Sequence, residues 1–169
     1  EEVLQRQPEA LRSFLLQTAI LDRLNGPLCD AVIGNHQQDS RARLEALQRG
    51  NFFLIPLDDK RHWYRYHHLF ADLLRQRLQR SSALSTGKEK GSVDELHRRA
   101  SKWYEHNGSA ADAIRHALAA EDFARAASLV EQVIPAMRRS RQETTVLSWL
   151  EALPDEILRC RPVLSVHYA

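Results

Sequence analysis

Apolar residues recur at helical spacing in three short segments at the start of the chain. The pattern predicts helices over 8–21, 28–34 and 41–50. Pro8 stands in a first-turn position of the first helix, and glycines end the other two, at Gly34 and Gly50. The residues expected to face inward are Leu11, Phe14, Leu15 and Ala19 in the first helix, and Leu44, Ala46 and Leu47 in the third.

The pattern then changes from helical spacing to short β-rich runs. FFLIPL (52–57) and WYRY (63–66) flank a polar turn over 58–61, which predicts a hairpin. Helical spacing returns over 68–80, with an apolar stripe formed by Leu69, Phe70, Leu73, Leu74 and Leu78. Three short helices, a hairpin wing and a long helix are the order of a winged helix. We therefore predict a winged-helix arm domain over 1–83.

The remainder of the chain is predicted to be helical, so the fold class is mainly α. Residues 81–92 are rich in Ser, Gly and Lys, and we place a linker or loop over 84–92. Helices are predicted over 94–108, 111–120, 123–134 and 141–153. Small residues stand at their expected crossings: Ala113, Ala117, Ala126 and Ala127. Residues 93–169 are thus expected to form antiparallel hairpins of a tetratricopeptide-like α-solenoid.

The composition indicates a cytoplasmic protein with no membrane segment. No run approaches the roughly 18 to 20 apolar residues that a membrane span needs, and the N-terminus has no export signal. Because the chain begins at Glu1 rather than Met, we interpret it as a piece of a longer protein. Cys29 and Cys160 both fall in apolar helical patterns, and we expect buried free thiols rather than a disulfide.

The positive charge is concentrated in one part of the chain. Residues 60–102 carry eleven basic and four acidic side chains, a net charge of +7, whereas residues 1–59 carry −3 and residues 103–169 carry −2. Such an excess suits a phosphate-bearing partner. A solvated face of Arg and Lys explains it equally well.

The motifs that would support catalysis or metal binding are incomplete. Gly87 and Lys88 are followed by Glu89 rather than Ser or Thr, and no apolar strand precedes them, so the Walker A pattern fails. Neither a Ser/His/Asp order nor a paired-carboxylate cleft stands out, and we predict that the chain is not an enzyme by itself. His67 and His68 are adjacent, so on a helix their side chains diverge by about 100°. We therefore predict no metal site at these two residues and His62, because no Cys or carboxylate stands at ligand spacing.

Three long stretches resemble one family. They are FLLQTAILDRLNGPLCDAV (14–32), LEALQRGNFFLIPLDDKRHWYRYHHLFADLLRQRL (44–78) and LHRRASKWYEHNG with AIRHALAAEDFARAASLVE (96–131). Together they are similar to MalT-like regulators, the large ATP-binding LuxR-type transcription factors of the STAND class of signalling ATPases.

The resemblance implies an arrangement of domains in a longer parent protein. A P-loop ATPase domain would precede the winged-helix arm. A tetratricopeptide-like sensor for a small-molecule or protein inducer would follow it, and a C-terminal helix-turn-helix would bind promoter DNA. In inactive family members ADP is held between the ATPase domain and the arm. Exchange for ATP with inducer bound drives oligomerisation, so ADP and ATP are expected cofactors of the parent, and none is expected to bind tightly to this chain alone.

The same resemblance singles out two residues beside the wing. The family pattern Tyr/Phe-Arg-Tyr-His-x-Leu-Phe falls on residues 64–70. It implies that His67 reaches the β-phosphate of ADP, while His68 stands at a variable, surface position. A helix N-terminus favours an anion, which agrees with this role. The residues alone leave another interpretation open, in which His67 only caps the helix or bonds the hairpin. Arg65 is a second candidate phosphate ligand, with a surface ion pair as its alternative.

An alternative function is direct DNA binding by the winged helix. Arg41, Arg43 and Arg49 on the third helix could enter a major groove, with Lys60 and Arg61 of the wing on the backbone. Glu45 among these arginines argues against it. The remaining aromatic residues and histidines are expected to be structural. Trp63, Tyr64 and Tyr66 would pack the wing against the helices, with adenine stacking as their alternative. His97, His106, His116, Trp103 and Trp149 would lie in the core or between helices.

Overall fold

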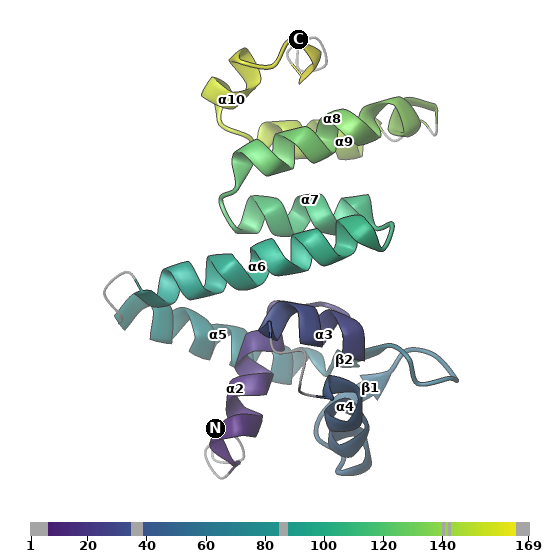
Figure 1. The fold of residues 1–169 in the computed structure, drawn as a ribbon, viewed down its shortest axis with the longest axis vertical. Coiled ribbons are helices and arrows are strands. Elements are labelled where there is room, and N and C mark those ends of the chain that lie inside the picture. The colour runs from purple at the N-terminus through teal and green to yellow at the C-terminus, as the bar shows by residue number, and fades with distance from the viewer. Residues whose placement is uncertain (1–6, 35–38, 85–87, 140, 142, 165–169) are drawn as a thin grey trace. The chain divides into compact units, whose positions relative to one another are not determined.

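The computed structural model describes residues 7–34, 39–84, 88–139, 141 and 143–164. The chain divides into two compact units, Glu1–Arg99 and Ala100–Ala169. The first unit contains α2 (Glu9–Thr18), α3 (Gly26–Ile33), α4 (Ser40–Arg49), β1 (Leu54–Pro56), β2 (Tyr64–Tyr66) and α5 (His68–Leu84). Three short helices followed by a hairpin and a long helix are the elements of a winged helix (Figure 1), and this confirms the predicted fold of the first part.

The short helices α3 and α4 begin at polar caps. The Asn25 side chain accepts a hydrogen bond from the Leu28 N–H at 2.7 Å, and Asp39 accepts from the Ala42 N–H at 3.0 Å. A Cβ atom on Gly26 would lie only 2.9 Å from Cβ of Arg41. Only glycine allows the first turns of α3 and α4 to approach this closely.

The wing is a two-stranded antiparallel sheet in which Leu54 pairs with Tyr66 and Pro56 with Tyr64. Leu24 adds one bridge at its edge, since its backbone N–H and C=O both bond to Tyr64 at 2.8 Å. In the connecting turn, the Asp58 carboxylate accepts a hydrogen bond from the His62 N–H at 2.7 Å. Besides the pairing between its two strands, the wing is therefore hydrogen-bonded to the loop before α3.

The core of the first unit comes from every element around it. Its most buried large side chains are Phe14, Leu15, Leu21, Leu24, Leu28, Leu44, Tyr64 and Leu74. Two predicted core residues are exposed, Ala46 and Leu69. On α4 the inward face narrows to Leu44 and Leu47, and the buried stripe of α5 begins only at Phe70. Helical spacing alone placed Ala46 and Leu69 on the inward faces of their helices, but neighbouring elements do not cover these two side chains.

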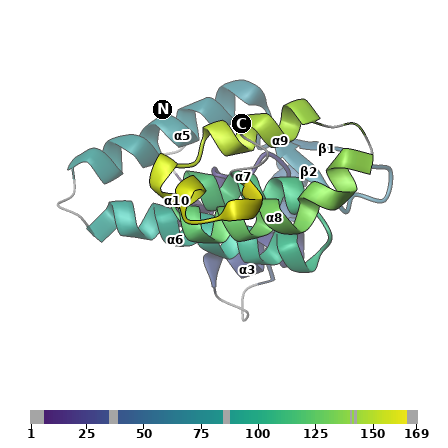
Figure 2. The same cartoon turned by 90° about the horizontal axis from the view of Figure 1, so that it is seen from above.

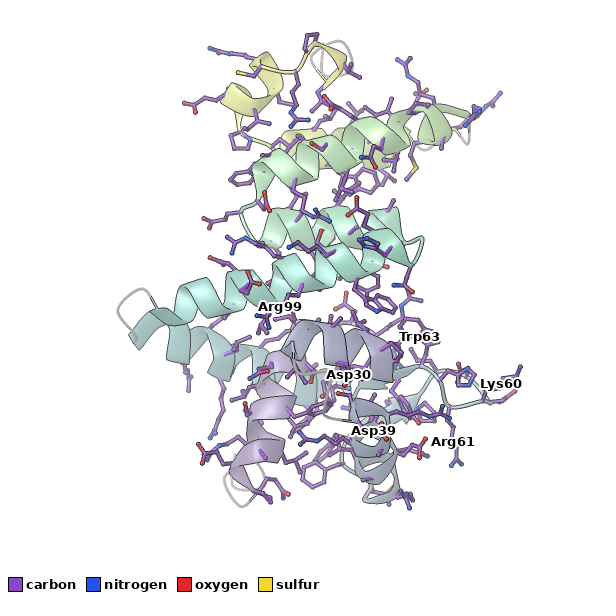
Figure 3. All side chains as sticks on the ribbon, in the orientation of Figure 1. Asp30, Asp39, Lys60, Arg61, Trp63 and Arg99 are labelled. Atoms are coloured by element: carbon purple, nitrogen blue, oxygen red, sulfur yellow. The ribbon has the colours of Figure 1, made fainter. Side chains whose placement is uncertain are left out.

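Helix α6 (Lys88–His106) contributes residues to both units. Within the first unit, the Arg99 guanidinium donates to the carbonyl oxygens of Val32 at 3.3 Å and Ile33 at 3.1 Å. A cation is favoured at this end of α3, because the last carbonyl groups of a helix carry partial negative charge. The Glu95 carboxylate forms an ion pair with the same guanidinium at 3.1 Å; Arg99 is labelled in Figure 3.

The second unit is helical throughout its described part. Besides the end of α6 it contains α7 (Ala110–Ala119), α8 (Phe123–Arg139), α9 (Glu143–Glu151) and α10 (Asp155–Arg159). Helix α8 packs with α7, α9 and α10 (Figure 2). The alanines predicted at close helix crossings, Ala113, Ala117, Ala126 and Ala127, are fully buried, as expected. The second unit thus confirms the prediction of a helical continuation.

Several details of the second unit differ from prediction. His106 is exposed, with Nδ1 at 2.7 Å from the Lys102 carbonyl oxygen, so it is a surface residue of α6. Cys160 is also exposed, since it follows the short helix α10, whereas Cys29 is fully buried as expected; both are free thiols. The helix predicted to stop at position 134 continues through Pro135 to Arg139. A proline removes one helical hydrogen bond, and here the helix continues past it.

The predicted linker over 84–92 falls partly outside the described residues, at 85–87. On either side of this gap the described backbone is helical, because α5 ends at Leu84 and α6 already begins at Lys88. The domain limits 1–83 and 93–169 therefore stay predictions. No helix in the described ranges is both long and apolar enough to cross a membrane.

Candidate functional site

His67 connects the wing to the long helix and is held by its backbone on both sides. Its N–H donates to the Phe53 carbonyl at 2.7 Å, which ties it to the start of the hairpin. Its carbonyl accepts from the N–H groups of Phe70 and Ala71, both at 2.9 Å, and these are the first hydrogen bonds of α5. His67 is thus the N-cap residue of this helix. The position of its side chain is set by main-chain contacts that do not require an imidazole.

The His67 ring is half-buried and lies against the ring of His68, with centroids 4.4 Å apart and planes inclined by 32°. His68 itself is exposed, as expected for the variable position. The first N–H groups of an α-helix have no intrahelical partner and carry partial positive charge. Two imidazoles at the N-terminus of a 17-residue helix can therefore bind an acceptor-rich anion. Within the described ranges, no group of three His, Cys, Asp or Glu side chains could hold a metal ion.

Arg65 occupies the middle of β2, opposite Ile55. It is exposed between the buried Tyr64 and Tyr66, because successive strand side chains point to opposite faces. In the described part of the chain, no hydrogen bond or ion pair joins Arg65 to His67. The structure places both predicted site residues near the end of the wing without bringing their side chains into contact.

Aromatic side chains fix the base of the wing against α5. The Phe70 ring lies 5.1 Å from Phe53, 5.8 Å from Tyr66 and 6.5 Å from Phe52, measured between centroids. The Tyr66 hydroxyl lies 2.8 Å from Thr18 Oγ1 of α2. Because Thr18 already donates to the Phe14 carbonyl, Tyr66 is the donor of this buried bond. These contacts confirm that the tyrosines of the wing pack it against the helices.

Two residues close to His67 have exposed apolar side chains, and this exposure was not predicted from the sequence. Phe53, whose carbonyl holds the His67 N–H, is 48% exposed, and Leu69 in the first turn of α5 is 67% exposed. Their exposure could not be read from periodicity, which placed both in apolar runs. Both side chains are therefore accessible at the surface close to His67.

The arginines considered for DNA binding are mostly engaged within the first unit. Arg41 pairs with Glu45 at 3.2 Å, and Arg49 Nε donates to the Glu45 carbonyl at 3.4 Å. Arg43 lies over the Phe14 ring, 5.6 Å from its centroid. Lys60 and Arg61 are exposed on the wing, where Figure 3 shows them projecting beyond the helices.

Comparison with known proteins gives a consistent family. The sequence profile of the MalT winged helix domain matches residues 1–86. The chain is 37% identical over 171 residues to the serine/threonine-protein kinase PknK of Mycobacterium tuberculosis, covering all of this chain and 15% of that protein. It is 34% identical over 164 residues to the HTH-type transcriptional regulator MalT of Cronobacter sakazakii, covering 97% of this chain and 17% of that protein. The chain thus spans about one sixth of the length of these relatives.

Proposed function

The chain belongs to the MalT winged helix domain family, and on this basis we propose that it is the nucleotide-sensing arm and the start of the sensor of a longer, ATP-dependent regulatory protein. The observation that carries the proposal is the placement of His67. Its backbone is fixed by Phe53 and by the first turn of α5, while its half-buried ring stays at the helix N-terminus. An imidazole held in this way can donate to a phosphate oxygen without a large loss of conformational entropy.

ADP bound to a preceding ATPase domain is the proposed ligand. His67 would contact its β-phosphate, and Arg65 would provide a second contact from β2. Bound ADP would supply negative charge to a region of the chain that is rich in basic side chains. The exposed Phe53 and Leu69 beside His67 would pack against the same preceding domain and exclude water from the contact.

The relatives support a regulatory rather than an output role for this segment. One is named a protein kinase and the other a transcriptional regulator, yet both contain a region similar to nearly the whole of this chain. A segment shared by a protein named as a kinase and one named as a transcriptional regulator is better suited to controlling their different activities than to carrying out either one. In the parent of this chain, we propose that the output is promoter binding through a helix-turn-helix, that the helical second unit begins an inducer-sensing domain, and that ATP drives oligomerisation in the cytoplasm.

The decisive experiment compares His67→Ala with His68→Ala in the longer protein that carries this chain. Loss of one charge-assisted hydrogen bond should weaken ADP binding by about 1.5 to 3 kcal/mol, or about 10- to 150-fold in Kd. It should also raise ATP-dependent oligomerisation without inducer. His68→Ala is the matched control, because His68 is the exposed neighbour in the same ring pair, and it should change either quantity by less than about twofold.

Thermal unfolding of the same variants separates sensing from helix capping. The main-chain bonds of His67 persist in an alanine variant, so its Tm should stay close to that of the wild type. Unchanged ADP affinity with a lowered Tm would assign His67 a structural role and contradict the proposal. Equal, small effects of both substitutions on ADP binding would contradict it as well.

Direct DNA binding is the competing function, and Lys60 and Arg61 on the wing are the residues that favour it. Duplex affinity of the 169-residue chain, measured between about 50 and 200 mM salt, distinguishes the two. Weak binding that is independent of sequence and falls steeply with salt is expected for nonspecific charge. Sequence-specific binding would favour the DNA-binding function over the regulatory arm.

A further inference from the structure

The outer half of the wing borders a pocket that the proposed ADP contact does not use. It has a volume of about 300 Å³ and lies on the first unit, between the first turns of α3 and α4 and the wing. Its lining includes Asn25, Gly26, Arg41, Arg61, His62 and Tyr64, whereas His67 does not line it. Gly26 lets the two helix N-termini come together at one side of this pocket.

One of the lining residues, Tyr64, has a buried hydroxyl group without a partner among the described residues. Tyr64 is only 1% exposed, and its hydroxyl has no hydrogen-bond partner in the part of the chain that the structure describes. Buried polar groups are nearly always paired, because an unmade hydrogen bond costs about 1–3 kcal/mol. An acceptor from outside the described chain, either a water or a ligand group, would satisfy this hydroxyl.

The Tyr64 hydroxyl is a donor at neutral pH. Burial raises the pKa of Tyr64, and the nearby Glu45 carboxylate raises it further, whereas the charges of Arg61 and Arg41 lower it by less. The phenol therefore keeps its proton and needs an acceptor.

The other polar groups around the pocket are mainly donors. Arg41, Arg61 and His62 are exposed at its rim, where Figure 3 shows Arg61 on the wing, and the N-terminus of α3 contributes partial positive charge. The Asn25 side-chain oxygen, an acceptor beside the pocket, is already bonded to the Leu28 N–H. A cluster of donors around a buried hydroxyl selects a ligand group with several acceptor oxygens.

The carboxylates of Glu45 and Asp58 weaken the preference for an acceptor-rich ligand only in part. Glu45 pairs with Arg41, but both side chains are exposed, and such surface pairs contribute little. The Asp58 carboxylate is bonded to the His62 N–H within the turn. Exposed arginine side chains change rotamer rapidly, so Arg41 and Arg61 can turn toward a ligand that enters the pocket and open the way to Tyr64.

We propose that this pocket binds a small molecule through its phosphate group, with the Tyr64 hydroxyl and the guanidinium groups of Arg41 and Arg61 as donors. The volume of about 300 Å³ favours a compact ligand over a duplex. Since the bound group would join the wing to α3 and α4, the pocket is an effector site that is separate from His67. Its occupancy would stabilise the first unit by mass action.

The test uses inorganic phosphate as the probe on the whole 169-residue chain, at constant ionic strength and with chloride as the reference anion. Phosphate at tenfold its Kd should raise Tm by about 3 to 6 °C. Tyr64→Phe removes only the hydroxyl oxygen and should abolish this rise without lowering Tm in chloride. Tyr66→Phe removes the equivalent atom two residues away, outside the pocket, and should retain the full rise from a lower starting Tm.

A second matched pair tests the charge. Arg61→Gln should lose most of the phosphate response, whereas Lys60→Gln, which removes the same charge from a neighbour that does not line the pocket, should keep it. Phosphate also stabilises proteins by exclusion from their surface, and that effect would be equal in all five proteins. An equal rise in all five, no rise in the wild type, or a response that survives Tyr64→Phe would each overturn the proposal. So would Arg61-dependent binding of a DNA duplex without any response to inorganic phosphate, because the arginine would then contact a nucleic-acid backbone.

Discussion

The two tyrosines of β2 lie two residues apart and face the same core, but their hydroxyl groups differ in hydrogen bonding. Tyr66 and Tyr64 are both almost fully buried. The Tyr66 hydroxyl donates to Thr18 of α2, 2.8 Å away, and its ring packs on Phe70. The Tyr64 hydroxyl has no such partner among the described residues and lies beside a pocket. One end of the wing is thus bonded to the helices, and the other has an unused donor.

The difference suggests separate roles for the two ends of β2: one end positions His67, and the other is available to a ligand. The Tyr66 end continues directly into His67 and α5, so its side-chain contacts fix the position of the proposed nucleotide contact. The Tyr64 end is held mainly through its backbone, by Leu24 and by the pairing of β1 with β2. Its side chain can therefore bind a ligand without disturbing the strand pairing.

The strongest test of the fixed end is Phe70→Ala. Phe70 contacts three aromatic rings and is nearly fully buried. Removing this ring should lower the free energy of unfolding by about 3–5 kcal/mol, as measured by urea denaturation. Leu69→Ala is the control, because the adjacent Leu69 side chain is largely exposed, and it should change stability by less than about 0.5 kcal/mol. Similar losses in the two variants would mean that Leu69 is buried in solution.

Alkaline pH should destabilise the same end. Burial raises the pKa of the Tyr66 hydroxyl, and it likewise raises the pKa of the Cys29 thiol. The folded state keeps these protons where the unfolded state, with ordinary pKa values near 10 and 9, has lost them. Stability is then complete below about pH 9 and declines above it, by about 1.4 kcal/mol per pH unit for each group.

Urea denaturation between pH 7 and 11 measures this decline. Tyr66→Phe should make the slope above pH 10 shallower by the contribution of one group, because phenylalanine has no proton to lose. An unchanged slope would show that Tyr66 does not titrate differently in the folded and unfolded states.

The winged helix itself was predictable because the apolar period changes twice. Helical spacing up to Gly50, alternation around the hairpin and helical spacing after His67 define the element order, and caps such as Asn25 and Asp39 are local signals. Periodicity gives the direction of a side chain but not the extent of the elements that cover it. This is why Leu69 and Ala46 were wrongly expected in the core.

The candidate sites were less predictable, for a related reason. The backbone of His67 follows from its place between strand and helix, but its ligand lies outside the chain, and its role and that of Arg65 stay predictions. The pocket is lined by residues that lie as far apart in the chain as Asn25 and Tyr64, and the pairing of Tyr66 depends on Thr18, which is 48 positions away. Nothing local distinguishes the hydroxyl of Tyr64 from that of Tyr66.

The smallest effect provides the sharpest test of the comparison. Tyr66→Phe and Tyr64→Phe each remove one oxygen atom from the same strand. The first breaks a buried hydrogen bond and should cost about 1 kcal/mol of unfolding free energy in chloride buffer at pH 7. The second removes a donor that has no partner and should leave stability unchanged or raise it by a few tenths of a kcal/mol. Equal losses would mean that the Tyr64 hydroxyl is already bonded in solution, for example to an ordered water. Its donor would then be unavailable unless a ligand displaced that partner, and the difference between the two ends of the wing would disappear.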